Sequence, residues 1–152
     1  MINKNELRQQ RLLSELSEAE LDVVAEKIVY EKYAKGVTIL KEGDPTKGIY
    51  LLKKGKVEIS KITPDGWKQT LAVLAEHHFF GELSVIEDRT SHSADVTAIE
   101  DAEIFLISKD HLKGLEESQP ALMYKIMRAI ARMASRNVRS MNEKLVKALI
   151  SY

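Results

Sequence analysis

The middle of the chain alternates between apolar and polar residues with a period of two, and this pattern constrains the fold more than any other feature. Between Tyr33 and Ile107, short runs rich in β-branched residues are separated by glycine, proline and aspartate. Successive residues of a strand point to opposite faces, so this period is typical of half-buried strands. Many short strands at such spacing favour an antiparallel sandwich or jelly roll. The expected strands cover 37–40, 49–52, 57–60, 70–74, 95–99 and 102–107.

Helical patterns flank this region on both sides. Residues 5–31 have helical spacing, and Ser17 followed by Glu20 has the form of a capping box. A shorter helix containing the leucines of 12–16 is expected before it, and another short helix near 109–115 follows the strands.

The sequence therefore predicts an α+β fold that is mainly β, an antiparallel jelly-roll β-barrel with N-terminal helices and a long C-terminal helix. A chain of 152 residues is expected to form one domain with a real core. The N-terminal helices are assigned to 1–31, the jelly roll to 32–107 and the C-terminal helices to 108–152.

The last helix is expected to be unusually long. It begins near Pro120, and no glycine or proline interrupts the run to Tyr152, which corresponds to about 45 Å of helix. Such a helix is longer than the core of a small domain can cover, so we expect a homodimer through it. Its apolar stripe repeats at three- and four-residue steps and comprises Leu122, Ile126, Ala129, Ile130, Met133, Met141, Leu145 and Ala148.

Charge is distributed unevenly along a chain whose net charge is zero. Residues 120–152 contain seven basic residues and one acidic residue, a local charge of +7 − 1 = +6. A basic helix on an acidic body can contact nucleic acid, or it can be solvated or docked on its own acidic domain. No aromatic or glycine-rich nucleic-acid signature accompanies the charge, which favours the second interpretation.

Composition excludes several other classes of function. The chain has no cysteine, which excludes disulfides, thiolate metal sites and cysteine nucleophiles. No apolar run approaches the roughly 20 residues that span a bilayer, and the N-terminus is polar, so we expect a cytoplasmic protein without a membrane partner. No metal site is expected either, because His77 and His78 are adjacent and lack a third ligand.

The stretch Phe79-Phe80-Gly81-Glu82-Leu83-Ser84 has the form of a phosphate-binding cassette, which extends over 79–96. A Gly-Glu step opens a helical turn whose free amides attract an anion. The carboxylate of Glu82 repels phosphate but accepts hydrogen bonds from a hydroxyl. About ten residues later, His92-Ser93-Ala94 leads into a strand. These features suit a ligand in which a phosphate lies next to a sugar.

Four segments in this order resemble the cyclic nucleotide-binding domain, the family found in catabolite activators and in regulatory subunits of cyclic-AMP-dependent kinase. The resemblance covers about 12–141 and implies the same fold. Its markers are Leu16-Ser17-Glu18-Ala19-Glu20-Leu21, Lys41-Glu42-Gly43-Asp44-Pro45, Ile49-Tyr50-Leu51-Leu52 with Gly55-Lys56-Val57, and Phe79-Phe80-Gly81-Glu82-Leu83-Ser84.

The resemblance also implies roles for individual residues. Glu82 is expected to bind the ribose 2′-hydroxyl, with Ser93 beside the phosphate. Gly81, Leu83 and Ser84 are expected to line the phosphate site through their backbone.

Two further positions are assigned by counting along the family's pattern. Asn137 falls where activators place polar side chains against the base, whereas Val138 beside it does not fit that role. The chain also departs from the pattern at 75–78, which reads Ala-Glu-His-His where the family has a glycine-rich loop.

His92 stands where the family has an arginine that bridges the cyclic phosphate. Histidine has no fixed charge at neutral pH and lacks the two-pronged donor geometry of arginine. The predicted consequence is weaker, pH-dependent phosphate binding, unless Arg89 reaches the ligand. The alternative is that His92 is a surface or strand-edge residue and that the pocket has lost its ligand.

The resemblance implies a regulatory module that binds cAMP or cGMP and signals occupancy to a protein partner by moving its long helix. The alternative is an interaction or dimerisation domain that keeps the fold without the ligand. Specific DNA binding is not expected, because the chain ends at Tyr152 without a helix-turn-helix domain. An enzyme is not expected, because His92 and Ser93, as neighbours on a strand, would point to opposite faces.

Overall fold

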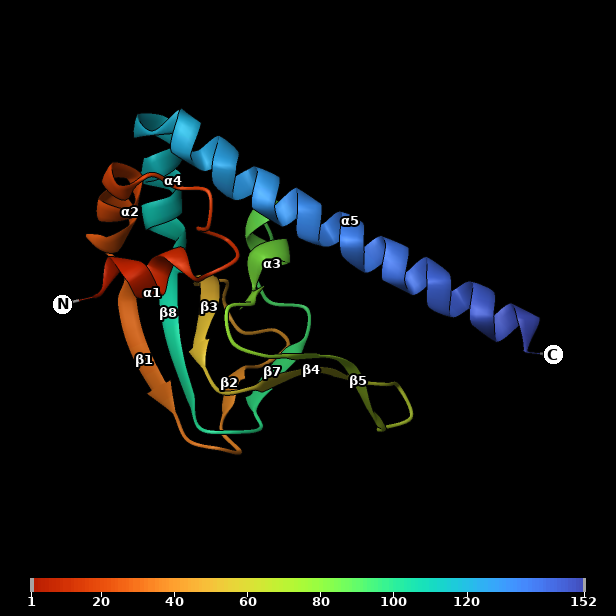
Figure 1. Cartoon of the computed structure of the whole chain (residues 1–152). Coiled ribbons are helices and arrows are strands. Elements are labelled where there is room, and N and C mark those ends of the chain that lie inside the picture. The colour runs from red at the N-terminus through yellow and green to blue at the C-terminus, as the bar shows by residue number, and fades with distance from the viewer. Residues whose placement is uncertain (1, 152) are drawn as a thin grey trace.

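Two four-stranded antiparallel sheets form the body of the protein in this computed structural model, which describes residues 2–151 (Figure 1). The two terminal residues of the predicted domain, Met1 and Tyr152, lie outside the described residues. One sheet has the order β1-β8-β3-β6 and the other β2-β7-β4-β5, which confirms the predicted β architecture. The strands are β1 (Val29–Tyr33), β2 (Thr38–Leu40), β3 (Gly48–Lys54), β4 (Val57–Ile62), β5 (Lys68–Leu74), β6 (Phe79–Phe80), β7 (Asp95–Ala98) and β8 (Ala102–Ser108).

Helices gather at one end of the sheets, and the long C-terminal helix, which was predicted, projects beyond them (Figure 1). They are α1 (Lys4–Arg8), α2 (Glu18–Ala25), α3 (Glu82–Ile86), α4 (Lys109–Ser118) and α5 (Pro120–Ile150). None of the described helices is long and apolar enough to cross a membrane.

Strand β3 connects two hydrophobic clusters. Its side chains alternate, so Ile49 and Leu51 pack against the helices, while Tyr50 and Leu52 pack between the two sheets. All four are at most 2% exposed. The sheet that contains β3 is therefore buried on both faces at its centre, which fixes the position of the strands that lead to the cassette.

The N-terminal prediction was right about the capping box and wrong about the extent of the helices. Ser17 and Glu20 form the reciprocal capping box at the start of α2. The helix ends at Ala25, however, and Val29–Tyr33 is a strand that pairs with β8. Valine and tyrosine favour strands, and pairing with β8 satisfies the backbone there. The jelly roll therefore begins three residues earlier than the predicted boundary.

The shorter helix predicted around Leu12–Leu16 is also wrong. The chain there makes consecutive turns, with Leu13 N–H donating to Gln10 O at 3.0 Å and Leu16 N–H to Leu13 O at 3.2 Å. Turns of this kind place leucines at a helix-like spacing without forming a helix, and all three leucines are buried in the core. The regular helix, α1, precedes them.

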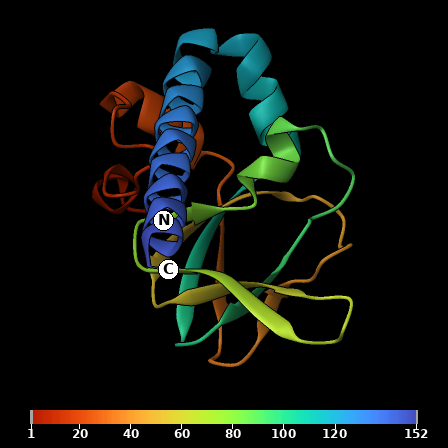
Figure 2. The same ribbon diagram turned by 90° about the vertical axis from the view of Figure 1, so that its right-hand side faces the viewer.

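Helix α5 has a docked half and a projecting half (Figures 1 and 2). Leu122, Met123, Ile126 and Ile130 are buried against the body, whereas every described residue after Met133 is exposed. The apolar stripe predicted for this helix is thus divided into two parts. Its first part packs on the protein's own core, and its second part is exposed.

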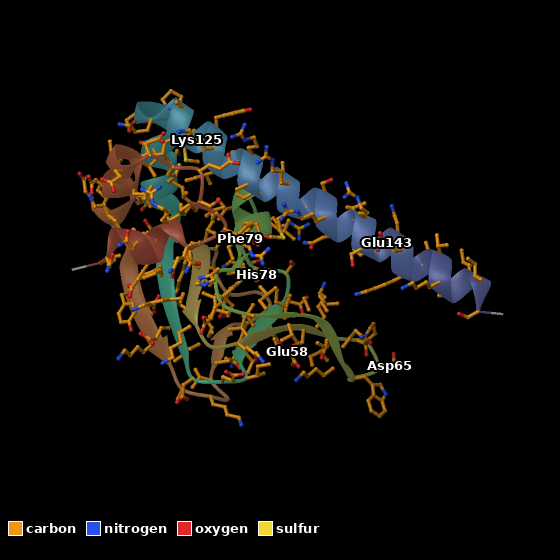
Figure 3. All side chains as sticks on the ribbon, in the orientation of Figure 1. Glu58, Asp65, His78, Phe79, Lys125 and Glu143 are labelled. Atoms are coloured by element: carbon orange, nitrogen blue, oxygen red, sulfur yellow. The ribbon has the colours of Figure 1, made fainter. Side chains whose placement is uncertain are left out.

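Ion pairs hold the docked half of α5. Lys125 pairs with Glu20 at 2.6 Å, and Arg128 and Arg132 both pair with Glu15. Figure 3 shows Lys125 near the N-terminal helices and Glu143 on the projecting half. Docking on the acidic body therefore accounts for three of the seven basic side chains. The four that form no ion pair within residues 2–151 are Arg136, Arg139, Lys144 and Lys147.

Candidate functional site

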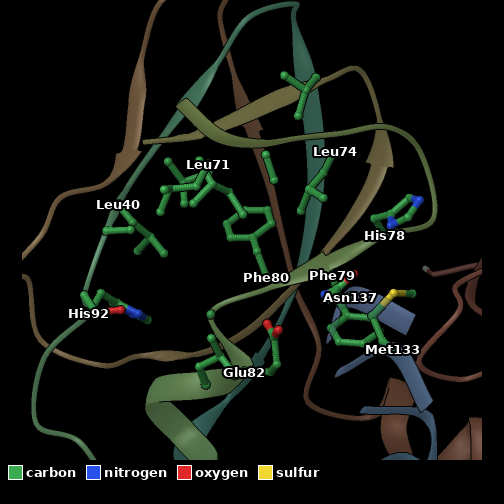
Figure 4. A pocket seen from close by; sticks show the side chains of 18 of the residues that line it. Leu40, Leu71, Leu74, His78, Phe79, Phe80, Glu82, His92, Met133 and Asn137 are labelled. Carbon is green, nitrogen blue, oxygen red and sulfur yellow. The ribbon is translucent and has the colours of Figure 1, made fainter. Parts of the chain in front are cut away.

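A cavity of about 570 Å³ lies between the sheets, α3 and α5 (Figure 4). It receives residues from both halves of the predicted cassette and from the long helix. Arg89 is absent from its lining. The predicted site residues that line it are Gly81, Glu82, Leu83, Ser84, His92, Ser93 and Asn137.

Gly81 makes the sharp change from strand β6 to helix α3 possible. Its φ of 85° lies in the left-handed region, which residues with a Cβ adopt at a cost. A Cβ there would also lie 3.0 Å from Gly48 O and 3.2 Å from Tyr50 Cδ2. Phe80, just before it, is anchored by stacking on Tyr50, with ring centroids 5.1 Å apart. The turn therefore presents the start of α3 to the cavity from a rigid base.

Glu82 points into the cavity between His92 and Asn137 (Figure 4). Burial raises the pKa of this carboxyl above its usual range, and a backbone hydrogen bond only partly opposes the effect. No cation contributes to the shift. Ionisation of this carboxyl is thus made unfavourable by desolvation, and a hydrogen-bond donor such as a ligand hydroxyl would stabilise the ionised form.

His92 is buried, with an exposed fraction of 4%, so the interpretation of it as a surface residue is wrong. Its backbone joins the 41–45 turn, donating to Asp44 O at 2.9 Å and accepting from Gly43 N–H at 2.8 Å. The ring meets Tyr50 edge-on, and its Nε2 has no hydrogen-bond partner among the described residues.

The pKa of His92 is lowered by burial, while Asp44 raises it and Lys47 lowers it further. The ring is therefore largely neutral at pH 7 in the free protein. A neutral ring presents one donor or acceptor at Nε2, according to its tautomer. The position that carries a fixed charge in the family pattern is polar and uncharged here.

Arg89 does not reach this site. Its side chain is exposed and pairs with Glu87, and its carbonyl accepts from Thr46 Oγ1 at 2.9 Å. These contacts hold the loop after α3 on the outside of the cavity. The structure therefore gives no geometric support to the expectation that Arg89 compensates for His92.

His92 and Ser93 lie in the loop before β7, not in a strand. The expectation that they point to opposite faces was therefore based on the wrong local structure, and both residues line the cavity. No side-chain hydrogen bond joins either of them to Glu82 within residues 2–151. They do not form the relay that nucleophilic catalysis requires.

Helix α5 covers one side of the cavity with Met133, Asn137, Ser140, Met141 and Lys144. Val138, which did not fit the base-contacting role, is 57% exposed and lies outside the lining. Lys144 was missed from sequence, although it stands seven residues after Asn137 and so on the same helical face. It is the one lysine or arginine among the described lining residues.

Most of the remaining wall is apolar and was also missed. All four residues of Leu71–Leu74 in β5 line it, together with Leu40, Ile59 and Phe80. A flat apolar or aromatic group fits this part of the cavity, while polar groups gather around α3 and the loop before β7. No group of histidine and acidic side chains within residues 2–151 is arranged to hold a metal ion.

Comparison with known proteins gives consistent matches. The sequence model described as the cyclic nucleotide-binding domain matches residues 30–119. A CRP-like cAMP-activated global transcriptional regulator of Mycobacterium tuberculosis is 28% identical over 68% of this chain and 46% of its own length. A cAMP-dependent protein kinase regulatory subunit of Colletotrichum orbiculare is 33% identical over 72% of this chain and 27% of its own.

Solved structures match the fold over a longer stretch. The crystal structure of the Thermus thermophilus catabolite activator protein matches with a TM-score of 0.75 and 26% identity, covering 90% of this chain and 62% of that one. The chain spans about half the length of the first curated relatives that it matches.

Proposed function

This chain belongs to the cyclic nucleotide-binding domain family, and on that premise we propose that it is a regulatory module that binds cAMP or cGMP in the cavity beside α3. The observation that carries the proposal is the convergence of Glu82, His92 and Ser93 with Asn137 of α5 on one cavity. Its volume of about 570 Å³ is in the range of small-molecule sites. Residues 1–152 would act as one binding domain rather than as an enzyme, in the cytoplasm.

In this proposal the ligand's polar and apolar parts meet matching walls. The ribose hydroxyl donates to Glu82, and the cyclic phosphate meets the amides of 81–84 with Ser93 and His92. The base lies against the apolar wall and Asn137. A neutral histidine in place of arginine removes a charge-assisted contact, which costs about 1.5–3 kcal/mol and corresponds to about one to two decades of affinity. Binding should therefore strengthen as pH falls and His92 becomes protonated.

Signalling would proceed through α5, because this helix carries Asn137 and Lys144 to the cavity. A ligand that contacts these residues more strongly in one helix position than in another shifts the population toward that position. A regulated protein partner would read the change in the projecting half. Specific DNA readout is not part of the proposal.

Calorimetric titration with cAMP and with cGMP, at pH 6 and at pH 8, tests the binding. We expect tighter binding at pH 6, and loss of most of the heat in Glu82→Ala. The matched control is Glu87→Ala, which removes the exposed glutamate at the C-terminal end of α3, outside the cavity lining. Absence of heat with both nucleotides at millimolar concentration, at either pH, would contradict the proposal.

A second candidate function is dimerisation through α5 that does not depend on a ligand. It is favoured by the exposed apolar side chains on the projecting half: Val138, Met141, Leu145, Val146, Leu149 and Ile150. Val138, Met141 and Leu145 follow the alternating three- and four-residue steps of a coiled-coil seam. This seam differs from the predicted stripe, because Ile126 and Ile130 of that stripe are buried in the body.

Light scattering after size-exclusion chromatography tests this dimer. Leu145→Glu places a charge in the seam and should give monomers, whereas Asn142→Glu, on an adjacent exposed position, should not. A ligand-independent module predicts that Glu82→Ala leaves the dimer unchanged and that neither nucleotide alters it. A wild-type monomer at all protein concentrations would exclude dimerisation.

A further inference from the structure

Three polar side chains of α5 line the cavity beside α3, and one of them differs from the other two in the hydrogen bonds that it can make. They are Asn137, Ser140 and Lys144. An asparagine amide and a serine hydroxyl each offer both a donor and an acceptor, whereas a lysine ammonium group offers three donors and no acceptor. Among the described residues of α5 at this cavity, Lys144 is therefore the one that requires acceptors from a ligand.

The ammonium group of Lys144 is free to contact a ligand. Its side chain is exposed, and it forms no ion pair and no side-chain hydrogen bond within residues 2–151. Lys125 and Arg128 of the same helix are instead engaged by Glu20 and Glu15 of the body. Lys144 thus brings an unpaired positive charge to the cavity.

Lys144 lies at the end of the cavity that is further from the cassette. Glu82 points into the cavity between His92 and Asn137 (Figure 4), and the lining continues along α5 for seven residues, or about 10 Å, from Asn137 to Lys144. Helical side chains lean toward the N-terminus of their helix, so Lys144 leans back along this face toward Asn137. A ligand held at Glu82 would therefore meet Lys144 with its far end.

The far end of a cyclic nucleotide in this position is its base, because the proposed function places the phosphate and the ribose at α3. Guanine presents two neighbouring acceptors, O6 and N7, and lysine is a common partner for this pair. Adenine keeps the N7 acceptor but carries a donor, the N6 amino group, in place of O6. An ammonium group opposite adenine would thus face another donor, whereas opposite guanine it finds two acceptors.

We propose that Lys144 is a specificity-determining residue that makes the cavity prefer cGMP to cAMP, an inference that rests on the proposed nucleotide binding. The ammonium group donates to O6 and N7 of guanine. Asn137 and Ser140 adapt to either base, so they contribute affinity without selecting between the two nucleotides. The choice of nucleotide is made by the projecting half of α5, and the cassette takes no part in it.

Calorimetric titration of the full chain at pH 6 with cGMP, cAMP and cyclic inosine monophosphate tests this inference. We expect cGMP to bind at least about tenfold more tightly than cAMP. Cyclic inosine monophosphate has O6 and N7 but lacks the 2-amino group of guanine, so it should bind as cGMP does. This third probe separates recognition of the O6 and N7 edge from recognition of the 2-amino group.

Three variants assign the preference to one side chain. Lys144→Met removes the donors and should weaken cGMP binding by about tenfold while leaving cAMP binding nearly unchanged. Lys144→Arg should keep the preference, because arginine can also donate to O6 and N7. The matched control is Lys147→Met, which changes an exposed lysine of α5 outside the cavity lining and should leave both affinities unchanged.

The outcomes separate this inference from the proposed function. Equal affinity of the wild-type protein for cGMP and cAMP overturns the inference and leaves nucleotide binding intact. An equal loss for both nucleotides in Lys144→Met also overturns it, because the ammonium group would then contact the phosphate that they share. A preference for cGMP over cyclic inosine monophosphate overturns it as well. Absence of binding by every nucleotide contradicts the proposed function itself, and the inference with it.

Discussion

Replacement of Gly81 by alanine probes the turn on which the candidate site depends. An L-residue forced to a φ of 85° costs about 1–2 kcal/mol. The added methyl group would also lie 3.0 Å from Gly48 O, which is backbone, and 3.2 Å from Tyr50 Cδ2, which is held by Phe80. Overpacking at a site that cannot relax costs about 1–3 kcal/mol more. We therefore expect Gly81→Ala to lower the free energy of unfolding by about 2–5 kcal/mol.

Gly66→Ala is the matched control, because Gly66 has a φ of 89° and no heavy atom within 4 Å of its ideal Cβ position. This variant should lower the free energy of unfolding only by the cost of the positive φ, about 1–2 kcal/mol. Urea unfolding followed by circular dichroism measures both variants, and the difference between them isolates the crowding. Equal losses would refute the reasoning, since they would show that the methyl group at 81 meets no rigid neighbour.

Three other predictions concern titration and docking. Burial lowers the pKa of His92, so the folded protein binds a proton at His92 less readily than the unfolded chain does. The contribution of His92 to the free energy of unfolding is therefore fully present above the unfolded pKa. It is lost as pH falls from the unfolded pKa toward the folded pKa. Thermal unfolding should show that the His92→Gln variant loses less stability below about pH 6.5 than the wild type does. Part of the loss should remain in the variant, because burial also lowers the pKa of His78. Burial raises the pKa of Glu82, so the contribution of this carboxyl to stability is present at low pH and is lost as pH rises through its pKa in the folded protein. Glu82→Gln should then raise the thermal midpoint at pH 7 while calorimetry shows weaker nucleotide binding, and an unchanged midpoint would contradict this. Glu15→Gln should release Arg128 and Arg132 and increase hydrogen exchange in 120–133 more than Glu18→Gln does.

The strands and caps could be predicted because their signals are local. Ser17 and Glu20 carry their capping box within four residues, and the turns of the jelly roll contain their own glycines. Strand β1 was missed because its residues are mostly exposed, so it lacks the clean alternation of a half-buried strand. Apolar residues of α2 lead up to it at helical spacing, and only its pairing with the distant β8 decides the outcome.

The site shows the same division between local and distant signals. Gly81 and Glu82 line the cavity side by side because the cassette is contiguous in sequence. Arg89 was expected nearby on its distance in sequence, but the loop bonds to Thr46 and turns it outward. Lys144 and the β5 wall reach the cavity only through tertiary packing.

Because only its first half is docked, α5 is fixed to the body at one end and extends freely from it at the other. Its fixed end is held by the buried residues from Leu122 to Ile130 and by the ion pairs to Glu15 and Glu20, and its free arm runs from Met133 to Ile150. That arm is about 25 Å long. A rotation of about 10° at Met133, where the cavity touches the helix, would move its tip by roughly 4 Å. A small rotation of the helix at the cavity would thus displace its tip by several ångströms. Such a displacement would change which residues of a partner the tip contacts.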